Sequence, residues 1–168
     1  MNRHTKDTLI TTTVIIFVII MLTVASGCSV DNPPTEYITD VDQVDVHGLT
    51  LKPSTGQKVS FEEMSAAYEQ TMACMGMTAP GPIVYFKSFL DYFGGAVGAP
   101  WAFHTQGTIY VNLDELPEVG IVRTRDTDIQ ALKHEYIHNI LFHTYGDGDT
   151  SHSSPMYKLC GLGVVVNN

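Results

Sequence analysis

The sequence predicts a small α+β domain, because two helical segments flank a stretch of strand-forming residues. One helix is expected at residues 60–75, a strand at 108–113 and a second helix at 128–145. The strand is rich in β-branched and aromatic residues, and both helices carry apolar residues at three- and four-residue steps. We therefore expect a small sheet packed on the second helix, with one helix N-terminal to it.

Residues 1–27 have the composition of a secretory signal. A short basic end is followed by an almost wholly apolar run from Leu9 to Val24, and small residues then lead to Cys28. This arrangement resembles a bacterial lipoprotein signal, which implies a lipid on Cys28 and a place in the cell envelope, outside the cytoplasm. An uncleaved membrane anchor is the alternative, although the apolar run is short for one.

The charge of the chain excludes some partners. The formal net charge is −9 at pH 7. An acidic surface repels nucleic acid and anionic lipid head groups, so we expect no nucleic-acid partner. Attachment to a membrane must then come from the lipid on Cys28.

The region after the signal divides into a tether and a domain. Residues 28–57 contain two adjacent prolines, many Asp and Thr residues and few large apolar side chains, and we expect an acidic tether with at most a short strand near Val44 to Leu51. Residues 58–168 should form the folded domain.

The first helix of this domain has clear start and stop signals. Ser60 and Glu63 have the spacing of a capping box, and Gly76 should end the helix. A turn follows, and residues 83–89 have the pattern of a strand. The helical residues with core-facing spacing are Phe61, Met64, Tyr68, Met72 and Met75.

The second helix is expected to bury one face and present another. Asp126 or Thr127 can cap its start. Ile129, Leu132, Tyr136 and Ile140 form the apolar stripe expected to face the core.

The other face carries the residues that indicate chemistry. His134 and His138 are one turn apart, so both imidazoles can bind one metal ion. Glu135 lies beside them and can act on a metal-bound water without being a ligand itself.

This His-Glu-x-x-His segment resembles the active-site helix of the zincin metallopeptidases, which implies a zincin-like fold and a Zn²⁺ cofactor. The strand at 108–113 is then the one expected to border the cleft and align a peptide. The zincin group with a downstream Glu ligand does not fit, because no Glu follows Glu135. The metzincin pattern does not fit either, because Thr144 stands where its third His would be.

The third metal ligand is expected after the second helix. A glycine-containing turn from residue 146 lets the chain reverse, and the seven residues from Tyr145 to His152 can span roughly 23 Å. We therefore expect His152 to complete the site. Asp149 and Asp147 are the alternative third ligands, or they orient a ligand histidine.

Cys74 and Cys160 are expected to form a disulfide, since the signal directs the chain to an oxidising compartment. The closed loop encloses the second helix and destabilises the unfolded chain by roughly 4–5 kcal/mol if the effect is entropic.

These features together predict a membrane-anchored, zinc-dependent hydrolase, a metallopeptidase with Glu135 as general base. The substrate class stays open among peptides, peptidoglycan crosslinks and small amides. Two alternatives remain: an envelope lipoprotein that binds zinc without catalysis, and a disulfide-stabilised interaction module without a metal.

Overall fold

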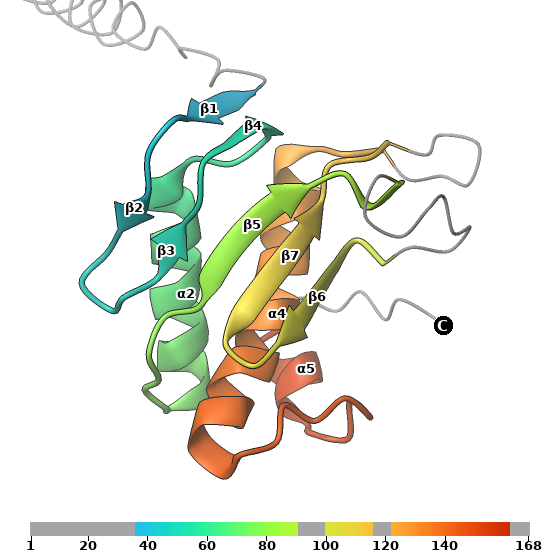
Figure 1. Cartoon of the computed structure of the whole chain (residues 1–168). Helices are drawn as coiled ribbons and strands as arrows, with labels where there is room; N and C mark the ends of the chain where they lie inside the picture. Colours follow the sequence, from blue (N-terminus) through green and yellow to red (C-terminus); the bar gives the residue numbers. More distant parts are fainter. Residues whose placement is uncertain (1–35, 91–99, 116–121, 162–168) are drawn as a thin grey trace, which may run out of the picture. The chain divides into compact units, whose positions relative to one another are not determined.

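Two long helices cover one face of a five-stranded sheet in the computed structural model (Figure 1). The structure describes residues 36–90, 100–115 and 122–161, all within the unit Pro34–Asn168. The elements follow in the order β1 (Tyr37–Thr39), β2 (Gln43–Val44), β3 (Thr50–Leu51), β4 (Ser54–Gln57), α2 (Phe61–Met75), β5 (Ile83–Lys87), β6 (Ala102–Thr105), β7 (Thr108–Asn112), α4 (Arg125–Tyr145) and α5 (Met156–Leu159). The expected α+β class is confirmed.

The larger sheet has the strand order β2-β3-β5-β7-β6. Its three central strands are parallel, and the edge strands β2 and β6 run antiparallel to their neighbours. β1 and β4 form a separate two-stranded sheet. The strand expected at 108–113 is β7, but it lies one strand in from the edge. Among the described strands β6 lies at this edge. The expectation that β7 aligns a peptide is wrong, because β7 is paired on both sides.

Residues 28–57, expected to form a tether, instead contribute four short strands from residue 37 onward. Leu49 and Leu51 are fully buried, and Gln57 Nε2 donates to Thr39 Oγ1 at 3.0 Å. Strands of two to four residues bury few side chains and pair mainly through backbone hydrogen bonds, which composition does not reveal. The folded domain therefore begins well before residue 58.

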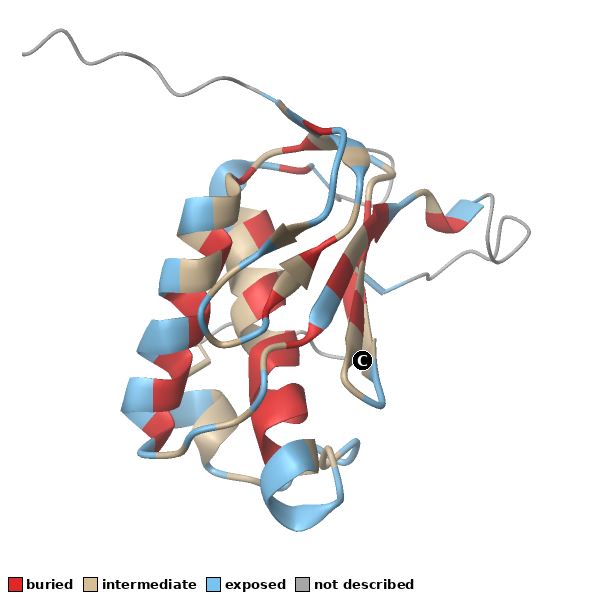
Figure 2. Cartoon of the chain, turned by 60° about the vertical axis from the view of Figure 1, so that its left-hand side comes forward, coloured by how far each residue is buried: buried red, intermediate tan, exposed pale blue. Residues whose placement is uncertain are grey.

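Helix α2 has the ends that the sequence predicts. The Glu63 N–H donates to Ser60 Oγ at 3.2 Å, and the Ser60 N–H donates to Glu63 Oε2 at 2.9 Å. Gly76 ends the helix in the left-handed conformation with φ 63°. Figure 2 shows buried residues along one side of the helix. They are Met64, Ala67, Tyr68, Thr71, Met72 and Met75.

Helix α4 begins at Arg125, earlier than expected, and its N-cap is Thr124 rather than Thr127 or Asp126. Thr124 Oγ1 accepts from the Thr127 N–H at 3.2 Å, and Thr127 Oγ1 accepts from the Thr124 N–H at 2.9 Å. Two threonines three residues apart thus form a capping box. In most capping boxes the second residue is Glu or Gln rather than Thr. The expected apolar stripe faces the core, with Leu132, Tyr136 and Ile140 fully buried.

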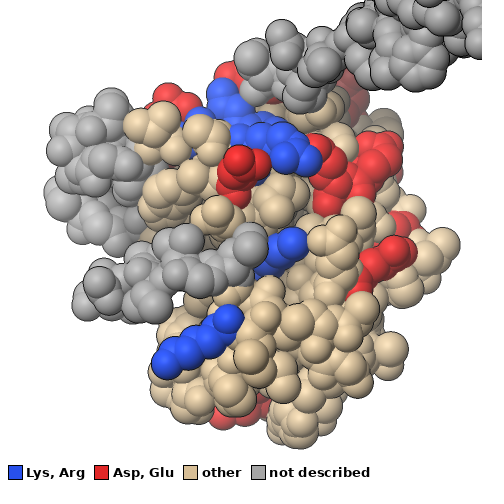
Figure 3. All heavy atoms as spheres, turned by 180° about the vertical axis from the view of Figure 1, so that it is seen from behind, with Lys and Arg blue, Asp and Glu red and all other residues tan. Residues whose placement is uncertain are grey.

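The helix side of the molecule carries mixed charges (Figure 3). On this face, Lys and Arg side chains lie among Asp and Glu rather than in one continuous basic surface. Arg125 pairs with Glu63 and so joins α4 to α2. This pair is partly exposed, so its contribution is at most about 1 kcal/mol.

The expected disulfide is present. Cys74, near the end of α2, is bonded to Cys160, directly after α5, across 86 residues of sequence. The bond holds the chain after α4 against α2.

Candidate metal centre

Three imidazoles converge beside the second half of α4. The Nε2 atoms of His134 and His152 are 3.0 Å apart, those of His138 and His152 are 3.2 Å apart, and those of His134 and His138 are 3.3 Å apart. These three residues form a group that could hold a metal ion. The structure thus brings His152 to the helical pair, as expected.

Local backbone geometry brings the third histidine back to the helix. Gly146 ends α4 with φ 77°, which lets the chain turn away from the helix axis. Asp149 and His152 both have left-handed backbone conformations, with φ 52° and 56°. Such conformations are uncommon for residues other than Gly, and they gather at functional sites where surrounding contacts maintain them.

The distances fit one bound ion. Three nitrogen ligands at about 2.0–2.1 Å from a tetrahedral ion lie about 3.3–3.4 Å apart, close to the separations observed. The donor set also fits, because imidazoles bind divalent transition metals well. Three side chains account for three of the four positions around a tetrahedral ion.

His138 presents the correct nitrogen. Its Nδ1 lies 2.5 Å from the Gly148 carbonyl oxygen, which can only accept, so Nδ1 carries the proton. The lone pair is then on Nε2, the atom that faces His134 and His152. Hydrogen bonding of the distal nitrogen to a carbonyl is the usual way in which proteins orient a ligand histidine.

Burial keeps two of the three imidazoles neutral near pH 7. It lowers the pKa of His134 to about 4, with further contributions from His138 and His152. Burial likewise lowers the pKa of His138, although the bond to Gly148 opposes this shift. A metal ligand must be unprotonated, so both side chains are ready to bind an ion without first losing a proton.

Glu135 is buried next to this cluster and is only 6% exposed. Burial raises the pKa of its carboxyl group to about 8, and a hydrogen bond from the His104 backbone N–H acts in the opposite direction. A divalent cation on the neighbouring imidazoles would lower this pKa, because a nearby positive charge favours the carboxylate.

The His104 backbone faces Glu135 because of the hairpin that contains β6. Gln106 and Gly107 have φ 46° and 82°, the signature of a type I′ turn between Thr105 and Thr108. In such a hairpin Thr105 and Thr108 form a hydrogen-bonded pair. The next pair, His104 and Ile109, makes no backbone hydrogen bonds across the two strands. The N–H and C=O groups of His104 therefore point away from β7.

The His104 side chain supports this edge. Its Nε2 accepts from the Gly107 N–H at 3.0 Å, and its ring lies parallel to that of His138 with centroids 6.3 Å apart. Burial, together with His138, lowers the pKa of His104 to about 4. No local signal could have identified its role, because that role depends on strand pairing.

The alternative ligands Asp147 and Asp149 are not in the histidine cluster. The Asp149 carboxylate accepts from three serine residues of its own loop, Ser151, Ser153 and Ser154. These bonds hold the pKa of Asp149 well below its usual range. The Asp147 carboxylate accepts from the Asp149 N–H at 2.9 Å. Both side chains shape the loop that carries His152.

Cys28 and the signal segment lie outside the described residues. Among the residues that the structure describes, no helix is both long and apolar enough to cross a membrane. Comparisons with protein families, with curated proteins and with solved structures found no match to this chain.

Proposed function

We propose that the chain is a zinc-dependent hydrolase, a metallopeptidase that resembles the zincins. The observation that carries this proposal is the convergence of three imidazole Nε2 atoms within 3.3 Å beside a buried carboxyl group. Three histidines and an open fourth position are typical of catalytic zinc sites, whereas structural sites close all four positions with protein ligands.

His134, His138 and His152 would hold the zinc ion. When bound, zinc supplies Lewis acidity, which lowers the pKa of water and polarises a carbonyl oxygen. The protein contributes rigidity, since two ligands project from one helix and the third comes from a loop pinned by Asp149.

Glu135 would act as the general base. Its carboxylate takes a proton from the attacking water and later delivers it to the leaving nitrogen. A general base works best when its pKa is near the working pH, and burial moves this carboxyl group in that direction. The His104 N–H holds the carboxylate in place while it exchanges the proton.

The substrate that suits this arrangement is an extended peptide. β6 is the edge strand of the sheet within the described part of the chain, and its hairpin directs backbone groups of alternate residues away from β7. A peptide can add to such an edge by main-chain hydrogen bonds, which leaves its amide groups in register with the strand. At His104 it would use the carbonyl oxygen, because the N–H donates to Glu135. The same edge carries His104, which contacts Glu135, so a bound peptide would pass beside the proposed base.

The decisive experiment compares the parent chain with Glu135→Gln. We expect both to bind zinc with the same stoichiometry, while cleavage of a peptide library falls by about 10²- to 10⁴-fold in the variant. His134→Ala should lose both zinc and cleavage. A parent chain that binds zinc and cleaves nothing would favour a non-catalytic zinc lipoprotein. A parent chain without zinc would favour an interaction module held by its disulfide.

We also propose that this activity resides at a bacterial cell envelope, through a lipid on Cys28. The support is the order of basic, apolar and small residues before that cysteine. Incorporation of labelled fatty acid into the parent chain, and its loss in Cys28→Ser, would test the anchor. Incorporation that persists in Cys28→Ser would argue against it.

A further inference from the structure

The segment that carries His152 meets the core through partly buried side chains, those of Met156, Tyr157 and Cys160. His152 is exposed, and none of the four residues of α5 is buried. The bonds made by the Asp149 carboxylate link residues of the same loop and so shape it without attaching it to the domain. The Gly148 carbonyl oxygen of this loop lies 2.5 Å from His138 Nδ1 and so ties the loop to α4.

Tyr157 adds a second link between this loop and α4. Its hydroxyl group lies 2.7 Å from His138 Nδ1, 3.2 Å from the Gly148 oxygen and 3.4 Å from the Asp149 oxygen. The single proton on His138 Nδ1 can be shared between the Gly148 oxygen and the Tyr157 hydroxyl oxygen, while the hydroxyl proton goes to a loop carbonyl. One side chain thus joins a helical ligand to the loop of the third ligand.

The ring of Tyr157 also contacts all three imidazoles. Its centroid lies 5.2 Å from that of His134, 5.0 Å from that of His138 and 4.9 Å from that of His152. Such distances are typical of packed aromatic pairs. The ring therefore limits how far any of the three imidazoles can tilt.

The disulfide holds Tyr157 itself. Cys160 lies three residues beyond Tyr157 and is bonded to Cys74 of α2. Directly after it, Gly161 packs closely against the chain. A Cβ added there would lie 2.8 Å from the backbone carbonyl oxygen of Tyr157 and 3.0 Å from Ile137 Cδ1. Tyr157 lies within α5, a single short turn that ends directly before Cys160, so this turn transmits the restraint.

We infer that Tyr157 is a positioning residue of the metal centre and that the Cys74–Cys160 disulfide keeps it in place. This inference rests on the proposed metal site but not on hydrolysis. Tyr157 touches no reacting atom in this role. It aligns His138 and His152 so that the ion meets three ligands already in position, and loss of this alignment weakens binding.

The experiment uses Co²⁺ as the probe, titrated into the full, metal-free chain and followed by visible absorption. We expect Tyr157→Phe to weaken Co²⁺ binding about 10- to 100-fold, with the stoichiometry unchanged. Tyr145→Phe is the matched control, because Tyr145 lies at the end of α4 and is 66% exposed. This control should bind Co²⁺ like the parent. Equal affinity of Tyr157→Phe and the parent would overturn the inference.

The disulfide is tested with Cys74→Ser/Cys160→Ser, which leaves no thiol at these positions to bind the probe. We expect weaker Co²⁺ binding in this variant, and a smaller further loss when Tyr157→Phe is added, because the two changes act on one restraint. Full additivity would show that the disulfide acts independently of Tyr157. If the serine variant fails to fold, judged by circular dichroism, the single Tyr157→Phe variant still decides the role of the tyrosine.

Failure of the inference differs from failure of the proposed site. A parent chain that binds no Co²⁺ overturns both the metal centre and this role of Tyr157. A parent that binds Co²⁺ tightly, with Tyr157→Phe unaffected, overturns the role of Tyr157 alone.

Discussion

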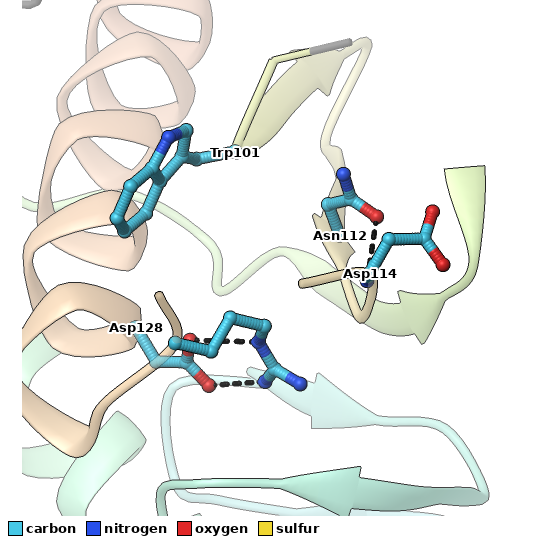
Figure 4. Close-up of a pocket in the computed structure, with 5 residues that line it drawn as sticks. Trp101, Asn112, Asp114 and Asp128 are labelled. Atoms are coloured by element: carbon cyan, nitrogen blue, oxygen red, sulfur yellow. Dashed lines mark hydrogen bonds and ion pairs between the residues drawn. The ribbon is translucent and has the colours of Figure 1, made fainter. Parts of the chain in front are cut away.

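Helix α4 holds two polar clusters that satisfy their hydrogen-bonding groups in different ways. Near its start, the Arg123 guanidinium pairs with the Asp128 carboxylate (Figure 4) and also donates to the Gly56 oxygen at 3.0 Å and the Leu113 oxygen at 3.4 Å. Farther along the helix, three imidazole Nε2 atoms face one another. In the first cluster a positive and a negative side chain neutralise each other. The second cluster brings together three imidazole nitrogens.

This difference teaches how to separate a structural polar cluster from a binding site. Asp128 and His138 are both buried, and burial shifts the pKa of each toward its neutral form, upward for Asp128 and downward for His138. Their partners distinguish them. Asp128 meets Arg123 and the Lys58 N–H, whereas the lone pair of His138 Nε2 meets other imidazole nitrogens. Converging lone pairs repel one another, and a cation relieves that repulsion.

Breaking the first cluster should give the largest loss of stability. Arg123→Met leaves the Asp128 charge buried without its partner, so we expect the free energy of unfolding to fall by about 3–5 kcal/mol. Urea denaturation of the metal-free chain measures this loss. The double variant Arg123→Met/Asp128→Leu should recover much of it, because no charge is then left unpaired. A loss below about 1 kcal/mol for the single variant would contradict the view that this pair anchors α4.

The second cluster should respond to metal rather than to the loss of one side chain. With free Zn²⁺ at 100 times its dissociation constant, the free energy of unfolding should rise by about 2.7 kcal/mol. His152→Ala should abolish most of this rise. Without metal, His152 is exposed, so the same variant should change stability by no more than about 0.5 kcal/mol. A large loss in metal-free His152→Ala would mean that the cluster is a structural contact.

Local sequence signals predicted the parts of the molecule that local physics determines. The capping box at Ser60 and Glu63 and the stop at Gly76 are confirmed, because a helix end is decided within a few residues. The placement of His134 and His138 on one helical face follows from helix geometry alone.

The remaining features depend on contacts between distant residues. β6 has only four residues, and its role at the edge follows from pairing with β7 and from a turn at Gln106 and Gly107. Tyr157 lies 19 positions from His138, and no periodic pattern links them. Arg123 bonds to Gly56 across 67 residues. Such partners are chosen by the packed fold, so a single sequence does not reveal them.

The smallest change in Co²⁺ affinity is expected for the loop aspartates. It separates a metal ligand from a side chain that only holds the ligand's loop in place. Asp149 accepts four hydrogen bonds from its loop, whereas the Asp147 carboxylate accepts one. We expect Asp149→Ala to weaken Co²⁺ binding about tenfold, since lost support for a ligand typically costs that much or somewhat more. Asp147→Ala is the matched control and should stay within about twofold of the parent, because it removes a single exposed contact.

The size of the Asp149 effect separates two roles for this side chain. Removal of a direct ligand would cost far more than a tenfold change, since it removes one of the three groups that bind the ion. A loss greater than about 1,000-fold in Asp149→Ala, with little change in His152→Ala, would therefore make the carboxylate the third ligand in place of the imidazole. A tenfold loss in Asp149→Ala and a severe loss in His152→Ala would instead assign Asp149 to the loop, because its carboxylate already accepts bonds from three serines of that loop.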